Sequence, residues 1–361
     1  MNTSNIDYRH VYFTKTKTSL TTNSLNRSPL RRPFLLVSIV TALLGFPLLG
    51  TFAETASIRI EVVEVFDYPG VGNQTFANKI NDAGEIVGSY EDSSAVTRGY
   101  FRTADGHFSA PIVEPNDTGN LTFCLGINNS RVICGGYVSS DGEEHGFFLS
   151  GGTFTEYDVP DALATQVSGI NDAGDFAGDF TDATGLDQGF VSLGGTITPF
   201  SVPGATLTIA NQLNASNQYV GEFFDRAFIP HGFYGDNNGV LRGPVDPPGS
   251  TGTVLFGIND RGWVVGRYVD SAQVTHGLLF KPPNSFVVFD YPGSTFTSLD
   301  GINHEGFICG RYIDASGISH GILARARRTM GNEASMELNE EKEEQDASRE
   351  DGGGLSFPGE N

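Results

Sequence analysis

The sequence predicts an all-β fold, a six-bladed β-propeller of four-stranded blades. Two observations lead to this prediction: a segment of about 45 residues recurs six times, and a strand-like segment before the first repeat supplies the fourth strand that the last repeat lacks. The composition agrees with it. The chain has 46 Gly and 27 Phe but only 18% charged residues, which favours short strands joined by tight turns over long amphipathic helices.

The repeats align on one Asn, and each reads T-x4-[IL]-N-x6-G-x-[YF]-x-D-x5-H-G-F with few departures. The aligned residues are Asn81, Asn128, Asn171, Asn214, Asn259 and Asn303. Each repeat predicts four short strands: one ending at Ile-Asn, one through the Gly and the aromatic residue, one starting at His-Gly-Phe, and one entering a segment such as Asp-Val-Pro. The intervening turns carry Asn, Asp and Gly, which tolerate tight or left-handed backbone. An open solenoid is the alternative.

The two ends of the repeat region complement each other. The last repeat stops after its third strand, at residues 321–327, whereas residues 57–70 (SIRIEVVEVFDYPG) precede the first repeat and match a fourth strand at residues 285–293 (SFVVFDYPG). We therefore expect the N-terminal strand to complete the last blade and close the ring, which leaves no broad open edge.

Segments such as GINDAGDFAG and the His-Gly-Phe tripeptide resemble the repeats of the bacterial extracellular HAF family, which is named after a His-Ala-Phe tripeptide. The resemblance spans about residues 57–324. It implies a secreted propeller-like repeat protein and no particular reaction.

Three regions are expected along the chain: residues 1–54 as an export signal with a preceding segment, residues 55–328 as the propeller, and residues 329–361 as an acidic, disordered tail. Residues 31–53 (RRPFLLVSIVTALLGFPLLGTFA) have the basic start, apolar run and small residues of a cleavable signal, with cleavage near Ala53. The twin-arginine route is an alternative, although Leu30 stands where Ser or Thr is usual. An uncleaved anchor and a start codon assigned too early are further alternatives. The protein is expected to be secreted or periplasmic, with no stable membrane span after cleavage.

The net charge of −21 argues against nucleic acid as a partner, because binding a phosphate backbone relies on Lys and Arg. The motifs indicate no cofactor, no metal site and no catalytic residue, and we expect a monomer that binds an extracellular protein or glycan. The turn at residues 171–175 could be a calcium loop, but the other repeats lack its carboxylates, which favours a plain turn. Cys134 and Cys309 are expected to be small buried groups, and a disulfide between Cys124 and Cys134 stays possible.

Polar residues recur in each repeat at the positions of the Thr, the Asp and the His. If Ile80 pairs with Val87, the Thr faces the Asp, and the Asp faces the His, across three strands. We interpret this row as a structural network that ties the strands of each blade together, since copies spread around a ring cannot converge on one substrate; a general base or a metal site is the alternative. The network comprises Thr75, Asp92, Arg98, Thr122, His145, Thr165, Asp182, Gln188, Thr208, Asp225, His231, Thr253, Asp270, His276, Thr297, Asp314 and His320.

The aromatic residue before each Asp is expected to face the residue after His-Gly, as Tyr268 would face Leu278, and to pack blade against blade. Trp263 is expected to be an exposed turn aromatic, and His107 and His304 to be isolated surface residues.

A function specific to this protein is expected where the repeats differ, above all on the innermost strands. The ligand-binding candidates there form an axial patch of Asn78, Lys79, Asn211, Gln212 and Asp300. The predicted function is a secreted binding or scaffold module. The alternatives are a propeller enzyme that acts on extracellular polysaccharide, which needs paired carboxylates, and a purely structural surface component.

Overall fold

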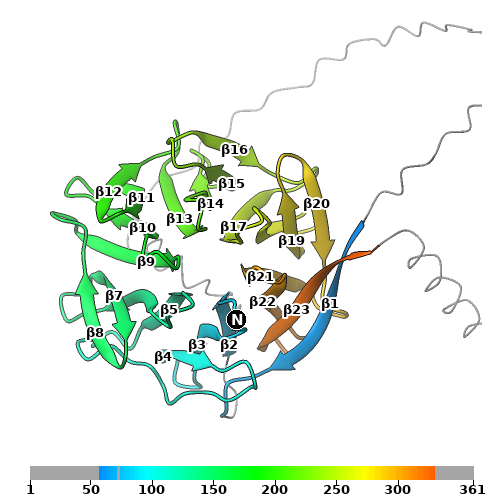
Figure 1. The fold of residues 1–361 in the computed structure, drawn as a ribbon, viewed down its shortest axis with the longest axis horizontal. Coiled ribbons are helices and arrows are strands. Elements are labelled where there is room, and N and C mark those ends of the chain that lie inside the picture. The colour runs from blue at the N-terminus through cyan, green and yellow to red at the C-terminus, as the bar shows by residue number, and fades with distance from the viewer. Residues whose placement is uncertain (1–56, 71–73, 330–361) are drawn as a thin grey trace, which may run out of the picture. The chain divides into compact units, whose positions relative to one another are not determined.

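The computed structural model describes residues 57–70 and 74–329, and these residues form 23 β-strands and no helix. The strands gather into blades around a common axis (Figure 1), which confirms the predicted all-β, six-bladed propeller. The expected export signal and all but the first residue of the expected tail lie outside the described residues. Within the described ranges there is no helix of the length and hydropathy needed to cross a membrane.

Each repeat supplies one blade, numbered here in chain order. Blade 1 contains β2 (Gln74–Ile80), β3 (Ile86–Glu91) and β4 (Thr97–Arg102). Blade 2 contains β5 (Thr122–Ile127), β6 (Ile133–Val138), β7 (Glu144–Ser150) and β8 (Thr153–Tyr157). Blade 3 contains β9 (Ala164–Ile170), β10 (Phe176–Thr181), β11 (Asp187–Leu193) and β12 (Thr196–Phe200). Blade 4 contains β13 (Leu207–Leu213), β14 (Tyr219–Phe224), β15 (Pro230–Gly235) and β16 (Leu241–Val245). Blade 5 contains β17 (Gly252–Ile258), β18 (Val264–Val269), β19 (Thr275–Lys281) and β20 (Ser285–Phe289). Blade 6 contains β21 (Phe296–Ile302), β22 (Phe307–Ile313), β23 (Ser319–Thr329) and β1 (Ser57–Phe66).

The N-terminal strand completes the last blade, as the sequence predicts. Strand β1 pairs antiparallel with β23, from Ser57 opposite Thr329 to Phe66 opposite Gly321. Blade 6 therefore joins the first and the last described segments of the chain (Figure 1). Its outer edge is the edge of β1.

Blade 1 departs from the predicted four strands. Its sheet has three strands, and the segment that should form the fourth makes isolated bridges from Gly99 to Ile112 and from Arg102 to Phe108, together with hydrogen bonds between Ser109 and Phe101.

The predicted register within the blades is wrong by two residues. Ile80 pairs with Ile86, not Val87, because the Asn81 turn is one residue tighter, and a bulge between Ala77 and Lys79 shifts the pairing by one more residue. Thr75 consequently faces Tyr90 and not Asp92. The same bulge interrupts the innermost strand of the other five blades.

The apolar core lies between neighbouring blades. Val87 of blade 1, for example, packs with Cys124, Ile133 and Phe147 of blade 2. The inner strands β5, β9 and β17 are buried along their whole length, whereas the outer strands β8 and β12 are largely exposed. The burial of the strands thus decreases from the axis to the rim of the propeller.

Two expectations about single residues are settled by burial. Trp263 is only 5% exposed, so the expectation of an exposed aromatic is wrong: its ring packs between blades 5 and 6, among residues such as Leu279 and Ile308. Cys124, Cys134 and Cys309 are buried free thiols, so no disulfide links Cys124 to Cys134.

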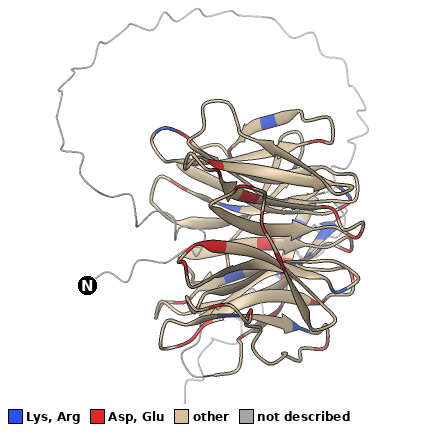
Figure 2. Ribbon diagram, turned by 90° about the vertical axis from the view of Figure 1, so that its left-hand side faces the viewer, with Lys and Arg blue, Asp and Glu red and all other residues tan. Residues whose placement is uncertain are grey.

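Acidic residues are spread over the strands and turns of the propeller, with fewer basic residues among them (Figure 2).

Candidate functional site

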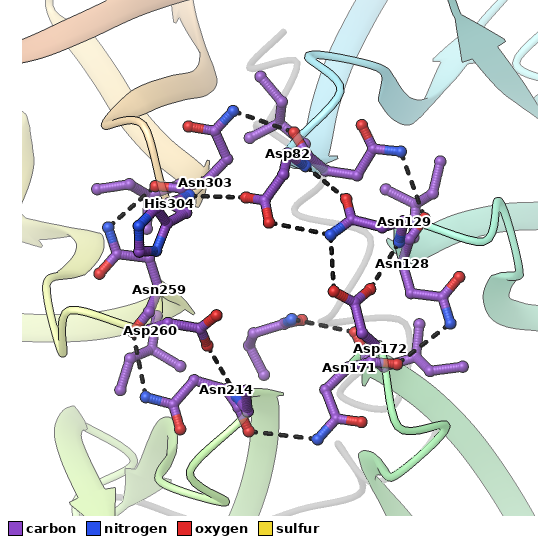
Figure 3. A pocket seen from close by; sticks show the side chains of 18 of the residues that line it. Asp82, Asn128, Asn129, Asn171, Asp172, Asn214, Asn259, Asp260, Asn303 and His304 are labelled. Atoms are coloured by element: carbon purple, nitrogen blue, oxygen red, sulfur yellow. Dashed lines mark hydrogen bonds between the residues drawn. The ribbon is translucent and has the colours of Figure 1, made fainter.

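The repeated Asn residues form a closed cycle of hydrogen bonds around the axis (Figure 3). Each Asn donates its Nδ2 proton to the backbone carbonyl of the corresponding Asn in the next blade, at 3.0 to 3.3 Å, and Asn303 of blade 6 closes the cycle onto Asn81 of blade 1. The Oδ1 atom of the same side chain accepts a backbone N–H within its own turn, as Asn171 does from Ala173 and Asp175. These bonds confirm the turn interpretation of residues 171–175.

The residues that follow these asparagines add a second set of links. Oxygen atoms of Asp82, Asn129, Asp172 and Asp260 accept backbone N–H groups of the preceding blade at 2.7 to 2.8 Å. Ala215 and His304 stand at the same position and have no side-chain oxygen, so this second set is not continuous. His304 is exposed, as predicted, but it lies in the ring of labelled residues in Figure 3 and is therefore not isolated.

The ring encloses a small polar pocket at one end of the axis. The pocket has a volume of about 70 Å³ and is lined by the repeated turns together with Gln212. Pockets for small-molecule ligands usually have volumes of about 300 to 1,000 Å³. The axial pocket is therefore large enough for water or a single ion and too small for a saccharide.

The predicted axial patch does not form one ligand site at this pocket. Of its five residues, Gln212 lines the pocket, and its Nε2 lies 3.4 Å from the carbonyl of Ile170. Asn78 donates to the carbonyl of Cys124 at 2.9 Å, and Asn211 donates to the carbonyl of Leu255, also at 2.9 Å, so both link neighbouring blades.

The remaining patch residues are buried. Lys79 and Asp300 are each 4% exposed, and Asp300 accepts a hydrogen bond from Ser298 at 2.6 Å. The register explains why the repeats differ here: Asn78, Asn211 and Asp300 are the bulge residues of their strands, which the ladder leaves unpaired.

At the opposite end of the strands, four histidines each lie between two carboxylates. The Nδ1 atoms of His145, His231, His276 and His320 lie 2.7 to 2.9 Å from the Asp that follows the fourth strand of the same blade. Their Nε2 atoms lie 3.4 to 3.7 Å from an Asp of the turn between the second and third strands. In blade 6 the first of these carboxylates is Asp67, which follows β1, so His320 also ties the ring closure.

The Asp that follows the fourth strand was not part of the predicted network, although the sequence indicates it. An Asp follows the fourth strand in every blade that has a His, whereas Val113 and Ser201 follow it where Arg98 and Gln188 replace the His. Arg98 and Gln188 instead donate to Asp92 and Asp182 at 2.7 and 2.8 Å. In blade 2, Asp141 bonds His145 because Ser139 stands at the usual Asp position.

The repeated Thr contacts neither the Asp nor the His. In five of the six blades its Oγ1 accepts the backbone N–H of a residue in the connection from the preceding blade, as Thr165 does from Val159 at 3.0 Å. In the sixth, Pro247 stands at the donor position. Proline has no N–H, and the Oγ1 of Thr253 has no partner among the described residues.

The aromatic residue two before the Asp is paired in the strand register with the His position and not with the residue after His-Gly, although the ring of Phe180 still packs on Phe190, as predicted, with centroids 6.2 Å apart. Tyr268 faces His276, not Leu278, and the two rings stack with centroids 4.9 Å apart. The other side of this aromatic faces the connection from the preceding blade. There Tyr68 stacks on Tyr90 and Tyr291 stacks on Tyr312, with centroids 3.8 and 3.7 Å apart.

The junction between blades 3 and 4 is hollow at this place. Val202 stands where Tyr68 and Tyr291 stand in their junctions, and the wall of β16 includes Gly243, which has no side chain. A cavity of about 400 Å³ lies there, lined by Val202, Pro203, Phe223, Asp225, His231, Phe233, Leu241, Gly243 and Pro244. We call it the blade 3–4 pocket.

The blade 3–4 pocket combines apolar walls with a polar side. Phe233 is fully buried, whereas Phe223 is half-buried and stacks on His231, with centroids 5.3 Å apart. Asp225 and His231 supply the polar groups. Backbone hydrogen bonds from Ile229 and Ala227 to Asp225 hold its pKa below the ordinary value, so its carboxylate is charged at neutral pH.

Comparisons with known proteins give structural likeness only. No protein-family profile matches the chain, and no curated protein sequence is significantly similar to it. Among solved structures, a lectin from Aleuria aurantia in complex with Fucα1-6GlcNAc is 11% identical, with a TM-score of 0.47 over 69% of this chain and 91% of that one. The lectin BP39L from Burkholderia pseudomallei is 12% identical, with a TM-score of 0.41 over 68% and 79% of the two chains. TolB from Acinetobacter baumannii is 11% identical, with a TM-score of 0.42 over 71% of this chain and 56% of that one. At these values the fold assignment rests on the strand pairing, and the neighbours add nothing on ligand or activity.

Proposed function

We propose that the protein is an exported binding module and that its blade 3–4 pocket takes a glycan. The observation that supports this most is the pocket itself: about 400 Å³, with the half-buried ring of Phe223 on one side and Asp225 and His231 beside it. A sugar presents an apolar C–H face to an aromatic ring and hydroxyl groups to charged and imidazole side chains. Apolar walls with a few placed polar groups are the usual make-up of a ligand site.

Binding is favoured over hydrolysis by the number of carboxylates. Hydrolysis of a glycosidic bond usually needs two carboxyl groups that flank the bond. Among the described residues that line the pocket, Asp225 is the one carboxylate. The exposed Phe228 and Ile229 lie in the turn that begins at Asp225, one of the pocket residues.

A glycan array probed with the full chain tests the proposal. We expect Phe223→Ala to weaken binding of the best glycan at least tenfold, because the variant removes the ring on which the sugar stacks. Tyr268→Ala is the matched control: it removes the aromatic at the same repeat position in blade 5 and should leave the affinity unchanged. Thermal unfolding of both variants checks that the fold is retained. The absence of any glycan ligand, or an equal loss in both variants, would contradict the proposal.

A further inference from the structure

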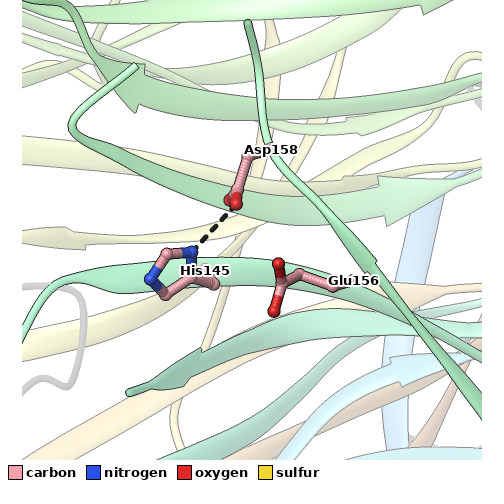
Figure 4. A group of neighbouring side chains, drawn as sticks. All are labelled: His145, Glu156 and Asp158. Atoms are coloured by element: carbon pink, nitrogen blue, oxygen red, sulfur yellow. Dashed lines mark hydrogen bonds and ion pairs between the residues drawn. The ribbon is translucent and has the colours of Figure 1, made fainter. Parts of the chain in front are cut away.

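Blade 2 holds a group of side chains that differs from the histidine sites of the other blades. His145 lies on β7, Glu156 lies near the end of β8, and Asp158 follows β8. One donor atom from each of the three residues lies within 4.8 Å of the others (Figure 4). Glu156 and Asp158 are exposed, so a solvated ion can reach the group.

The third donor has no counterpart in the other blades with a His. Two residues before the Asp that bonds Nδ1, those blades have Val65, Pro244 and Val288, whereas blade 2 has Glu156. The contact between His and Asp that ties the strands forms in the three other blades without this carboxylate. Glu156 is therefore not needed for the contact between His145 and Asp158.

A buried carboxyl group, Glu114, interacts electrostatically with Glu156 and His145. Glu114 is 4% exposed, it forms no ion pair within the described part of the chain, and its Oε2 accepts the N–H of Asn116 at 2.5 Å. Burial raises the pKa of Glu114, and the charge of Glu156 raises it further. A cation bound beside Glu156 would favour the ionised form of Glu114.

Glu156 and His145 are each held in place by a further contact. The hydroxyl of Tyr137 donates a hydrogen bond to Glu156, and Asp141 lies 3.4 Å from Nε2 of His145, on the far side of the ring from Asp158. Metal-bound histidines usually have their other ring nitrogen hydrogen-bonded to a carboxylate in this way. The Nδ1 atom is then the one that faces Asp158.

We propose that His145, Glu156 and Asp158 bind a divalent transition-metal ion of the Zn²⁺ class. One imidazole nitrogen with carboxylate oxygens suits such an ion better than Ca²⁺ or Mg²⁺, which take oxygen ligands. The ion takes the place of the proton between Nδ1 of His145 and Asp158, so a protonated His145 releases one proton to solvent when the ion binds. This site is separate from the blade 3–4 pocket, and neither proposal depends on the other.

Isothermal titration of the untagged, chelator-treated full chain with Zn²⁺ tests the site. We expect one saturable event, which Glu156→Gln and His145→Ala each weaken at least tenfold. Glu156→Gln keeps the size of the side chain and an acceptor for Tyr137. His276→Ala is the matched control, because it removes the corresponding His–Asp pair of blade 5 and should bind Zn²⁺ as the unaltered chain does.

Thermal unfolding gives a second readout that separates loss of the ligand from loss of the fold. Zn²⁺ should raise the Tm of the unaltered chain and of His276→Ala but not that of Glu156→Gln, while all three unfold cooperatively without metal. The proposal is overturned if Zn²⁺ shows no saturable binding, if Glu156→Gln binds it unchanged, or if Ca²⁺ binds as tightly as Zn²⁺ and His145→Ala has no effect.

Discussion

His145 shows how a single residue in this propeller is tuned by its neighbours. Burial by itself would lower its pKa, but the hydrogen bond and charge of Asp158, together with Asp141, outweigh burial and raise it. The protonated imidazole is thus favoured in the folded state. This contribution to stability is fully present below the pKa of an unfolded His, about 6.5, and is lost as the pH rises through the higher pKa of the folded state.

Asp158→Asn should lower the pKa of His145, because it removes the charge that faces Nδ1. A titration of the imidazole signals by NMR, with a chelator present, measures this directly. The difference in free energy of unfolding between the two proteins should shrink as the pH rises above the folded-state pKa. A titration midpoint that does not move would show that Asp158 does not set the charge of His145.

At the scale of the element, the innermost strand decides which side chains meet. A bulge near its middle and a tight turn at its end shift the pairing, so the repeated Thr caps the connection from the preceding blade and does not join the row of Asp and His. Asp270, for the same reason, accepts N–H groups of its own turn from Ala272 and Val274 and leaves Thr253 untouched.

Thr165→Val should cost about 1 to 3 kcal/mol of unfolding free energy, because it leaves the N–H of Val159 buried without an acceptor. Thr253→Val provides the comparison. Its hydroxyl has no partner within the described residues, so the substitution should be nearly neutral or stabilising. Urea denaturation of both variants measures the difference; equal costs would rule out the capping role.

At the scale of the whole molecule, the blades are joined by local links that repeat until they close. Each Asn bonds the next blade, and the last bonds the first across 222 residues of sequence. The pairing of β1 with β23 closes the outer part of the same junction. The ring is therefore closed by hydrogen bonds near the axis, from Asn303 to Asn81, and by strand pairing at the outer part of blade 6. No disulfide takes part in either link, because the three cysteines are free thiols.

Asn303→Ala should destabilise the protein by about 1 to 3 kcal/mol, since it removes the hydrogen bond from blade 6 to the carbonyl of Asn81, which keeps its bond from Gly84, and removes the acceptor of the Phe307 N–H. His304→Ala, one residue further, keeps its backbone bond to Asp82 and should change the stability by less than about 0.5 kcal/mol. Chemical denaturation of the two variants distinguishes them, and a neutral Asn303→Ala would mean that the cycle of hydrogen bonds does not stabilise the ring.

The sequence by itself determined the architecture. The six Asn-centred repeats predict the blades, and the unmatched strand at residues 57–66 predicts the closure, because both follow from local turn chemistry and from the need to bury each strand face. The presence of Asn in all six repeats also carried a signal beyond a turn. An ionised Asp could cap the turn but has no donor, whereas Asn combines an acceptor for its own turn with an N–H donor for the next blade.

Only the tertiary structure decided which side chains meet. A one-residue bulge that is present in every repeat leaves the spacing of the repeat pattern unchanged, yet it changes the partner of every residue beyond it, as the pairing of Thr75 with Tyr90 shows. The blade 3–4 pocket and the meeting of Glu156 with His145 depend in addition on contacts between segments that the repeat unit treats separately. A cavity is set by what neighbouring blades fail to fill, and that is a property of packing in three dimensions.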